Sequence, residues 1–273
     1  ALAAGYDAMA PDWLRIHDRA LSPDYRPPIR GPWEQAPDGL DVLASPAAVQ
    51  AVFPTFQSDI ANVLHVRRGG DVSGQQMGQL MLEHLREAGL TRVLGQVTAI
   101  ERSQRYSLIL DGDVGTVTTE QVVNAAGPFV GEIAGMLGES LPITNILQQK
   151  VAFEDIQQAV PRDLPFCIDI DPQTLDWTDE ERELLACDSA LTRYIEEMPG
   201  AVHCRPEGAA DGKWVKLGWA INESSSEPSR EPMLDDTYPE LVLRAAARMQ
   251  PRLSLIHLGP CRPATPAQAR CAA

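Results

Sequence analysis

Clusters of positive charge are missing from this sequence. The 273 residues carry a net charge of -15, and no stretch is rich in lysine or arginine. The phosphates of a nucleic acid and the headgroups of an anionic membrane both bind to clustered positive charge. We therefore expect neither a nucleic acid nor a membrane as a partner of this chain.

The cysteines and histidines lack the spacing of a metal site or a disulfide framework. The five cysteines are odd in number, and no two are spaced as Cys-x-x-Cys. The five histidines are scattered and support neither a zinc site nor a Ser-His-Asp arrangement. His203 and Cys204 are neighbours, but adjacent strand residues face opposite sides of a sheet and cannot easily act together. We expect no metal, and reduced thiols in a cytoplasmic protein.

Long hydrophobic runs are also absent. The most apolar stretch, residues 122–137, contains Asn124, Pro128 and Glu132 and is too short to span a bilayer. Residues 1–18 lack the basic start and the continuous apolar core of a signal peptide. The sequence therefore predicts neither a membrane-spanning helix nor a signal peptide.

The composition is that of a globular protein. Hydrophobic residues make up 44% of the chain and charged residues 22%, which is enough apolar material for a sizeable core. The length fits one large domain or two interleaved ones.

Residues 1–59 are predicted to form a helical and loop lead-in. Pro11 suits the first turn of a helix. The apolar face of that helix would consist of Trp13, Leu14, Ile16 and Leu21. Residues 22–39 are dense in proline and glycine and indicate a long ordered loop. Ser45 and Pro46 mark the start of a second helix.

Residues 60–140 alternate between strand and helix signals. The sequence predicts a strand at 62–68, a helix at 73–88, a strand at 91–101, hairpin strands at 106–110 and 115–123, and a strand-to-helix unit at 122–138. Ser73 and Gln76 have the spacing of a capping box, and Gly89 supplies a left-handed stop. A strand–helix–strand unit predicts parallel pairing of its two strands.

Residues 141–255 predict an α+β domain, because strands and helices follow one another without strict alternation. The strand-like segments are 141–155, 165–171, 201–208 and 213–221. Helices are expected to begin at Thr178 and Thr237, each followed by a glutamate three residues later. The irregular tail, residues 256–273, has no apolar periodicity. It reads either as a flexible tail or as out-of-frame translation of a GC-rich gene.

A tight turn at residues 124–127 is the clearest candidate for a ligand site. An apolar run passes into a helical pattern there through Asn-Ala-Ala-Gly. A helix start offers free N–H groups and partial positive charge, and small residues let a ligand approach the backbone. Alternatively, Gly127 only makes a tight turn and Asn124 caps it.

Four stretches, taken in order, resemble one known family. VVNAAGPFVGEIAGMLG at 122–138 resembles the second flavin-contacting segment of the D-amino-acid-oxidase-like FAD-dependent oxidoreductases, which include glycine oxidase, sarcosine oxidase and D-amino-acid dehydrogenases. RRGGDVSGQQMGQLMLEHLREAGL at 67–90 is similar to the glycine turn and long helix of that family. GQVTAIE at 95–101 is similar to its adenine-contacting strand, and LPITNILQQKVAFED at 141–155 resembles the start of its substrate-side sheet.

The resemblance implies a fold, a cofactor and a reaction. The fold would be α/β plus α+β, with residues 60–140 as the central part of a Rossmann-like FAD-binding layer and residues 141–255 as a β-sheet substrate domain. The cofactor would be FAD. The reaction would be oxidation of a C–N bond in a small-molecule amine or amino acid by hydride transfer to the flavin.

The resemblance also implies roles for particular residues. Val97 matches a position that contacts adenine through its backbone. Ala125, Ala126 and Gly127 match the small-residue turn near the ribose and pyrophosphate. Arg205 lies on a predicted substrate-domain strand and is the candidate for binding a substrate carboxylate, because a guanidinium fork suits that group. The alternatives are that Val97 is a core strand residue and that Arg205 is a solvated charge.

The sequence departs from the family at both ends. The family opens with a strand and Gly-x-Gly-x-x-Gly and closes with a glycine-rich flavin segment, and neither is present here. We therefore expect a truncated oxidoreductase. The rival interpretation is a non-catalytic remnant, or a fragment completed by a separate chain, that does not bind FAD alone.

Overall fold

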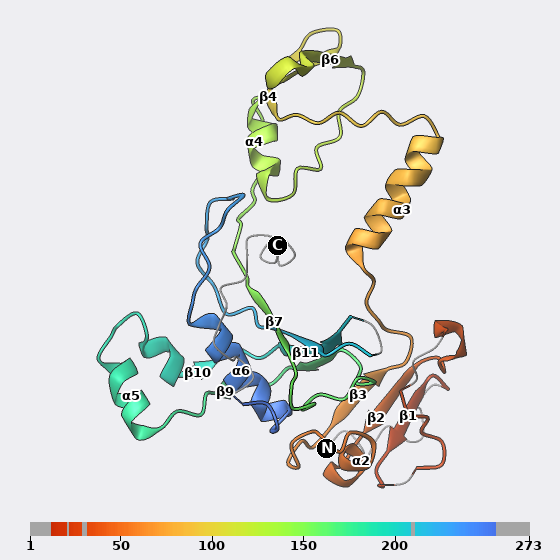
Figure 1. Cartoon of the computed structure of the whole chain (residues 1–273), viewed down its shortest axis with the longest axis vertical. Helices are drawn as coiled ribbons and strands as arrows, with labels where there is room; N and C mark the ends of the chain where they lie inside the picture. Colours follow the sequence, from red (N-terminus) through yellow and green to blue (C-terminus); the bar gives the residue numbers. More distant parts are fainter. Residues whose placement is uncertain (1–11, 21, 29–31, 209–210, 255–273) are drawn as a thin grey trace. The chain divides into compact units, whose positions relative to one another are not determined.

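The chain is described by a computed structural model that covers residues 12–20, 22–28, 32–208 and 211–254 (Figure 1). Two compact units divide the chain. The first unit comprises Ala1–Asp71, Gln148–Ile221 and Leu234–Ala273, and the second comprises Val72–Leu147 and Asn222–Met233. The domain limits predicted above stay predictions, and the tail at 256–273 lies outside the described residues.

A three-stranded sheet lies in the first unit. Its strands are β1 (Leu14–His17), β2 (Leu40–Leu43) and β3 (Val63–Val66), in the order β1-β2-β3. β2 pairs in parallel with β1 and antiparallel with β3. A 3-10 turn, η1 (Trp33–Gln35), precedes β2, and the helix α2 (Pro46–Val52) follows it. The predicted cap of α2 is confirmed, since the Ser45 hydroxyl accepts a hydrogen bond from the N–H of Ala48 at 3.2 Å.

The predicted helix at residues 13–21 is wrong, because Leu14–His17 form the strand β1. The apolar residues counted as one helical face also fit an alternation of period two. Leu14 and Ile16 face one side of the sheet, and Arg15 and His17 face the other. Parallel pairing with β2 places Arg15 directly beside Asp41, and that ion pair favours the strand over a short helix.

The two faces of the β1-β2-β3 sheet differ in polarity. The charged and polar face carries buried groups, among them His17 and Asp41, with 3% and 1% of their surface exposed. The aliphatic face carries Leu14, Ile16, Leu40, Val42, Leu64 and Val66. Leu64 and Val66 are exposed. The buried face thus carries these polar groups beside Leu43, which lies opposite His17 and is 1% exposed.

An antiparallel four-stranded sheet forms the centre of the first unit. Its strands, in spatial order, are β7 (Lys150–Glu154), β12 (Trp214–Gly218), β11 (Val202–Glu207) and β8 (Cys167–Asp169). All three pairings are antiparallel. Each strand falls inside a segment that the sequence predicts to be extended. A small antiparallel pair joins β9 (Gln173–Thr174) to β10 (Glu197–Met198).

The helix α6 (Tyr238–Met249) covers one face of this sheet and completes the core (Figure 1). Seven of its twelve residues are buried. The Tyr238 hydroxyl accepts a hydrogen bond from the N–H of Trp219 at 2.7 Å and donates one to the carbonyl of Gln149 at 2.5 Å. These bonds connect the start of α6 to the ends of β12 and β7.

A second helix, α5 (Asp179–Ala186), precedes the 3-10 turn η4 (Thr192–Ile195). The predicted capping box is confirmed, because Thr178 and Glu181 exchange both of its hydrogen bonds. The Glu181 carboxylate also pairs with Arg244 of α6 at 2.5 Å. Glu181 therefore both caps the start of α5 and connects this helix to α6.

The second unit contains one long helix and one small sheet. The helix is α3 (Gly74–Glu87), and the Ser73 hydroxyl caps it by accepting from the N–H of Gln76 at 3.3 Å. The sheet consists of β4 (Val97–Arg102), β5 (Tyr106–Leu110) and β6 (Thr116–Thr119), all antiparallel. The shorter elements are η2 (Gly112–Val114), η3 (Gly127–Phe129) and α4 (Val130–Gly135). The predicted hairpin around residues 111–113 is confirmed.

The predicted parallel pairing across α3 is wrong. β3 pairs with β2, and β4 pairs with β5, so the two strands belong to different sheets. Closing the short connection between β4 and β5 costs little entropy, whereas pairing β3 with β4 would close a loop that contains a whole helix. A crossover helix also needs a sheet to cover, and α3 buries none of its residues against the described chain.

The second unit has almost no hydrophobic core. Ile100 and Ala134 are the only hydrophobic residues of its described part that are buried. On α3, the apolar stripe of exposed side chains consists of Met77, Leu80, Met81 and Leu85. Among the described residues, no helix combines the length and the apolar character needed to cross a membrane.

Candidate functional site

The turn at residues 124–127 lies in the second unit and is held by Asn124. The amide nitrogen of Asn124 donates to the carbonyl of Val130 at 2.8 Å, and its amide oxygen accepts from the N–H of Ala126 at 3.3 Å. The strand predicted at residues 122–126 is wrong, because these residues pair with no described strand. The two side-chain bonds instead bend the backbone into η3. Capping of the turn by Asn124 is confirmed.

Gly127 has a positive φ of 58°, which is the left-handed conformation that favours glycine. A Cβ at this position would meet no described atom within 4 Å. The backbone conformation therefore requires the glycine, and the space beside it is open to a ligand. Ala125 and Ala126 precede it without bulky side chains. The turn is compatible with a cofactor that lies against the backbone, and its predicted role stays a prediction.

Val97 begins β4, which is an edge strand of its sheet. The carbonyl of Gln96 accepts from the N–H of Asp111 at 2.9 Å and so points toward β5. Backbone groups of successive strand residues point in opposite directions, so the N–H and C=O of Val97 point toward the open edge. No described strand covers that edge. These groups fit the predicted hydrogen bonds to an adenine ring, although the half-buried side chain also contributes to the sheet.

The second candidate place is the face of the β7-β12-β11-β8 sheet that α6 does not cover. The buried residues of one face include Val202, Cys204, Val215 and Leu217. The alternate residues point the other way in two rows. One row is His203, Gly218 and Lys150, and the next is Arg205, Lys216 and Ala152. His203 and Cys204 thus face opposite sides of the sheet, as the sequence predicts. We call the face of these two rows the open sheet face.

Arg205 lies on the open sheet face between two carboxylates. Its guanidinium pairs with Asp71 and, at 2.7 Å, with Glu207. Its side chain is 19% exposed. A substrate carboxylate would have to share or replace these partners, so the structure surrounds this candidate with competing acceptors. Arg205 lies in the first unit, whereas Val97 and residues 125–127 lie in the second.

His203 lies among cations on the same face. Burial lowers the pKa of His203 below its usual value, and the charges of Lys150, Arg205 and Lys216 lower it further. A hydrogen bond to the carbonyl of Ala201 acts in the opposite direction but does not outweigh them. The imidazole is therefore neutral at pH 7.

A third cluster, which the sequence analysis missed, lies under the β1-β2-β3 sheet. Asp41 accepts hydrogen bonds from Arg15 at 2.7 Å and from His17 at 2.7 Å, and Arg67 lies 3.2 Å from its second oxygen. Burial opposes the ionisation of Asp41, but the hydrogen bonds and charges of these partners outweigh it and lower its pKa. We call these four residues the Asp41 network.

His65 and Tyr25 extend the Asp41 network. The unprotonated Nδ1 of His65 accepts from Arg67 at 2.6 Å and from the Tyr25 hydroxyl at 3.0 Å. Burial and the charge of Arg67 lower the pKa of His65 to about 4. Burial raises the pKa of Tyr25 to about 12. Both side chains are therefore neutral at pH 7, and the buried charge is confined to Asp41 and its cations.

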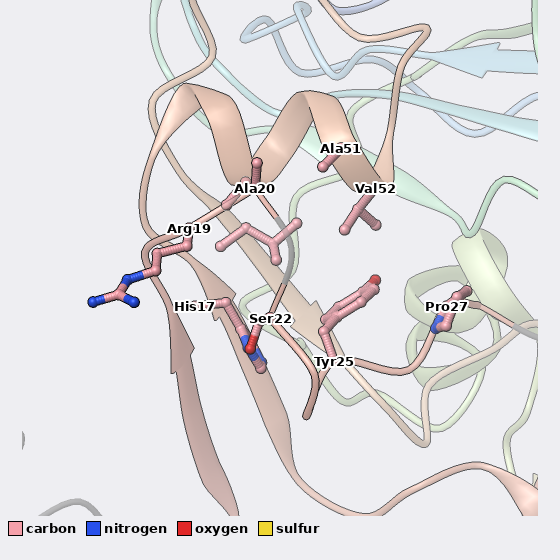
Figure 2. Close-up of a pocket in the computed structure, with 10 residues that line it drawn as sticks. His17, Arg19, Ala20, Ser22, Tyr25, Pro27, Ala51 and Val52 are labelled. Atoms are coloured by element: carbon pink, nitrogen blue, oxygen red, sulfur yellow. The ribbon is translucent and has the colours of Figure 1, made fainter.

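A cavity of about 210 Å³ lies beside this network, with His17, Ser22 and Tyr25 in its wall (Figure 2). The Ser22 hydroxyl lies 2.7 Å from Nδ1 of His17, whose Nε2 donates to Asp41. A Ser-His-Asp chain of hydrogen bonds therefore does form, and the expectation that this arrangement is absent is wrong. Asp41 also pairs with the guanidinium groups of Arg15 and Arg67, however, so its negative charge does not act on His17 alone. We assign this chain of hydrogen bonds a structural role.

A weak sequence signal for the Asp41 network exists. Arg15, His17, Asp41 and His65 occupy alternate positions of short apolar strands, and Arg67 directly follows β3. Buried polar residues at such positions need partners, and pairing between strands supplies them. Among the described residues, no group of three or more His, Cys, Asp or Glu side chains could hold a metal ion.

Comparison with known proteins gives a family and two solved structures. The model of the family described as DAO, FAD dependent oxidoreductase, matches residues 7–251. The crystal structure of glycine oxidase from Geobacillus kaustophilus aligns with a TM-score of 0.48 and 14% identity, covering 78% of this chain and 47% of that one. The crystal structure of L-proline dehydrogenase from P. horikoshii aligns with a TM-score of 0.46 and 12% identity, covering 78% and 48%.

No curated protein matches the sequence. The chain spans about half the length of the two solved structures. The mixed α/β fold expected from the sequence is confirmed. Because the family model matches residues 7–251, which is most of the sequence, the chain belongs to the DAO family of FAD-dependent oxidoreductases.

Proposed function

We propose that this chain takes part in oxidising a C–N bond of a small amine or amino acid, with FAD as the hydride acceptor. The observation that carries the proposal is the family match over residues 7–251. In flavoenzymes the cofactor supplies the redox chemistry, and the protein binds and orients the cofactor and substrate. The names of the two aligned structures suggest glycine and L-proline as the first substrates to test.

The cofactor contacts that we propose lie in the second unit. The outward backbone groups of Val97 would bind the adenine ring, and Ala125, Ala126 and Gly127 would lie against the ribose and pyrophosphate. Two features support this assignment. The edge of β4 is open in the described residues, and the space beside Gly127 is free.

The substrate contact that we propose lies on the open sheet face. Arg205 would bind a carboxylate in competition with Asp71 and Glu207. The α6 helix covers the opposite face, so this face is the one that the core does not use. Its neutral His203 and its cations provide groups that could orient an anionic substrate.

Flavin binding is the first experiment. The chain is purified with added FAD, separated from free FAD, and examined by absorbance at 450 nm. Retained flavin is then mixed with glycine or L-proline without oxygen, and bleaching reports reduction. Gly127→Ala should weaken FAD binding by about tenfold, whereas Gly138→Ala should not. Gly138 is the matched control, because its φ of 76° is also positive and a Cβ there would also meet no atom within 4 Å.

A second candidate function is a complementing fragment that binds no FAD alone. The nearly coreless second unit favours it, because a unit that buries only Ile100 and Ala134 lacks the apolar burial that stabilises a domain. Covering the α3 stripe with another polypeptide would supply that burial. Absence of retained flavin, together with concentration-dependent association in light scattering, would favour this candidate.

The matched variant for the fragment hypothesis is Met81→Gln with Leu85→Gln on α3. Both side chains are about half exposed, at 55% and 47%, so the double variant should keep the circular dichroism of the wild type. The double variant should no longer show concentration-dependent association, because the two substitutions remove apolar area from the α3 stripe. A double variant that associates as strongly as the wild type would exclude the stripe as the contact surface.

We further propose that the protein is cytoplasmic. Cys167 and Cys204 lie opposite each other on β8 and β11 and are both free thiols. Neighbouring free thiols are compatible with a reducing compartment. Thiol counting on protein from its native cells, prepared without reductant, tests this. A disulfide between Cys167 and Cys204 would contradict it.

A further inference from the structure

A proline turn brings two hydroxyl side chains to the same cavity. Residues 22–25 read Ser-Pro-Asp-Tyr, and the N–H of Tyr25 donates to the carbonyl of Ser22 at 3.2 Å. This bond closes a β-turn whose second residue, Pro23, has the fixed φ that such a turn needs. Ser22 and Tyr25 both line the cavity of about 210 Å³ beside the Asp41 network (Figure 2). The local sequence therefore places both hydroxyl groups at one cavity wall.

The hydroxyl proton of Ser22 is donated to His17. Nε2 of His17 lies 2.7 Å from the ionised carboxylate of Asp41, which can only accept, so Nε2 carries the ring proton. In the neutral imidazole Nδ1 is then an acceptor, and Ser22 donates to it at 2.7 Å. The Ser22 oxygen consequently faces any further partner as an acceptor.

The hydroxyl proton of Tyr25 is donated to His65. Nδ1 of His65 lies 2.6 Å from the guanidinium of Arg67, which can only donate, so this nitrogen carries no proton and also accepts from Tyr25 at 3.0 Å. The Tyr25 ring meets His17 edge to face, with ring centroids 5.4 Å apart, and lies 5.3 Å from the guanidinium carbon of Arg67. Tyr25 is thus a fixed part of the wall, and its oxygen is likewise left as an acceptor.

The rest of the described wall is mostly aliphatic. Leu43 and Ala48 are each 1% exposed and form its buried part. Ala51 and Val52 of α2 continue the wall toward solvent, where Ala51 is exposed. The side chain of Arg19 is 87% exposed, and Figure 2 shows its guanidinium directed away from the other lining residues. The cavity thus combines an apolar interior with acceptor oxygens on one side.

Charge and volume narrow the class of ligand. Asp41 carries one negative charge against the positive charges of Arg15 and Arg67, so the network beside the cavity disfavours a cation. An anion would meet the lone pairs of Ser22 and Tyr25 instead of donors. An apolar cavity of about 150 Å³ is large enough to hold benzene. The cavity therefore suits a neutral molecule with an apolar body of that size and one hydroxyl donor.

We propose that this cavity is a binding site for a small neutral alcohol or phenol. The ligand hydroxyl donates to the Ser22 oxygen, and the apolar body packs against Leu43, Ala48 and Val52. The hydrogen bonds of the Asp41 network keep their structural role, because they orient the acceptor before the ligand arrives. The site lies within the first unit and does not rest on the oxidation of a C–N bond.

Four fluorinated probes test the ligand class on the full chain without flavin, by fluorine NMR at pH 8. Para-fluorophenol should give a saturable shift. Para-fluorotoluene has nearly the same shape but no donor, and it should bind about tenfold more weakly, because it deprives the Ser22 oxygen of a hydrogen bond. The anion para-fluorobenzoate and the cation of para-fluorobenzylamine should give no saturable shift.

Two alanines of α2 provide a matched pair of variants. Ala51→Phe places a ring at the cavity wall and should weaken the binding of para-fluorophenol by about tenfold or more. Ala47→Phe adds the same side chain to an exposed position of the same helix that does not line the cavity, and should leave binding unchanged. Circular dichroism and the melting temperature check that each variant folds.

Nuclear Overhauser effects locate the bound probe independently of any variant. The ring protons of para-fluorophenol should show such effects to the methyl groups of Leu43, Ala48 and Val52. Effects confined to the methyl groups of Met77 and Met81 would place the probe on the exposed α3 stripe instead, and would overturn the assignment.

Three further results would overturn the proposal. The first is the absence of saturable para-fluorophenol binding in the wild type, and the second is equal binding in Ala51→Phe and the wild type. The third is binding of para-fluorotoluene or para-fluorobenzoate as tight as that of para-fluorophenol, because the cavity would then not select a neutral donor. Failure of the flavin experiment bears on the proposed function alone.

Discussion

His203 and Gly218 lie directly opposite each other on β11 and β12, and the imidazole occupies the volume that a side chain at 218 would need. Gly218→Ala should therefore push the ring away from the strand. The cost should be about 1–2 kcal/mol, because the ring can rotate toward solvent. The pKa of His203 should rise toward its ordinary value, since burial is the main cause of its low pKa.

An NMR pH titration of the His203 ring measures this change, and urea unfolding measures the stability. Gly70→Ala is the control, because a Cβ at Gly70 would meet no atom within 4 Å. An unchanged pKa of His203 in Gly218→Ala would show that the ring does not depend on the absent side chain.

Replacing the central carboxylate of the Asp41 network should be strongly destabilising. Asp41→Asn removes the charge that balances Arg67, whose side chain is 2% exposed. An unbalanced buried guanidinium should reduce the free energy of unfolding by about 3–5 kcal/mol. Asp38→Asn removes a carboxylate that is 73% exposed and pairs with Arg68, and should cost less than about 1 kcal/mol. Similar losses of unfolding free energy in Asp41→Asn and Asp38→Asn would contradict the structural role of the Asp41 network.

The stability of the first unit should fall when the pH is lowered from about 6.5 to about 4, in part because of His65. The folded state lowers the pKa of His65 to about 4, so the unfolded chain binds the proton first as the pH falls. The stability linked to this group is complete above pH 6.5 and is lost progressively below it. The loss should be on the order of 3 kcal/mol.

His65→Gln provides the comparison, because glutamine keeps a hydrogen-bond acceptor but does not titrate. Urea unfolding at several pH values should give a shallower acid decline for the variant than for the wild type. Parallel curves would mean that His65 is not buried neutral in the folded state.

The thiols of the first unit should differ widely in reactivity. Cys204 is 0% exposed, and burial raises its pKa. Burial also raises the pKa of Cys167 to about 12, whereas Cys187 is exposed. Iodoacetamide at pH 8 should therefore modify Cys187 about 100-fold faster than Cys204, because the thiolate is the reactive form. Peptide mapping by mass spectrometry follows both sites, and equal rates in the native protein would contradict the burial of Cys204.

Local signals in the sequence predict much of the secondary structure. Ser45, Ser73 and Thr178 cap helices where expected, because a cap depends only on groups three residues apart. The strands β7, β8, β11 and β12 follow from short apolar runs. The pattern at β1 fits a helix as well as a strand, because its four residues, between Trp13 and Asp18, are too few to distinguish a period of two from a period of 3.6.

Contacts between distant residues were not predictable in the same way. The partner of β3 is β2, and nothing in either segment specifies this pairing. Capping by Asn124 is only one of the two alternatives that the sequence offers for its turn. The Asp41 network depends on the register of three strands, which fixes Arg15, Asp41 and His65 in one row. The row of Lys150, Gly218 and His203 on the open sheet face depends on register as well, because the three residues are far apart in sequence.

The first unit is assembled from three separate stretches of chain, and the last of them carries α6. Ribosomal synthesis proceeds from the N-terminus, so the four-stranded sheet is complete before its covering helix leaves the ribosome. During that interval the apolar face of Val202, Cys204, Val215 and Leu217 lacks the helix α6, which packs against β11 and β12. Chains that stop before Tyr238 should then be substrates for chaperones and proteases, while chains that include Met249 should escape them.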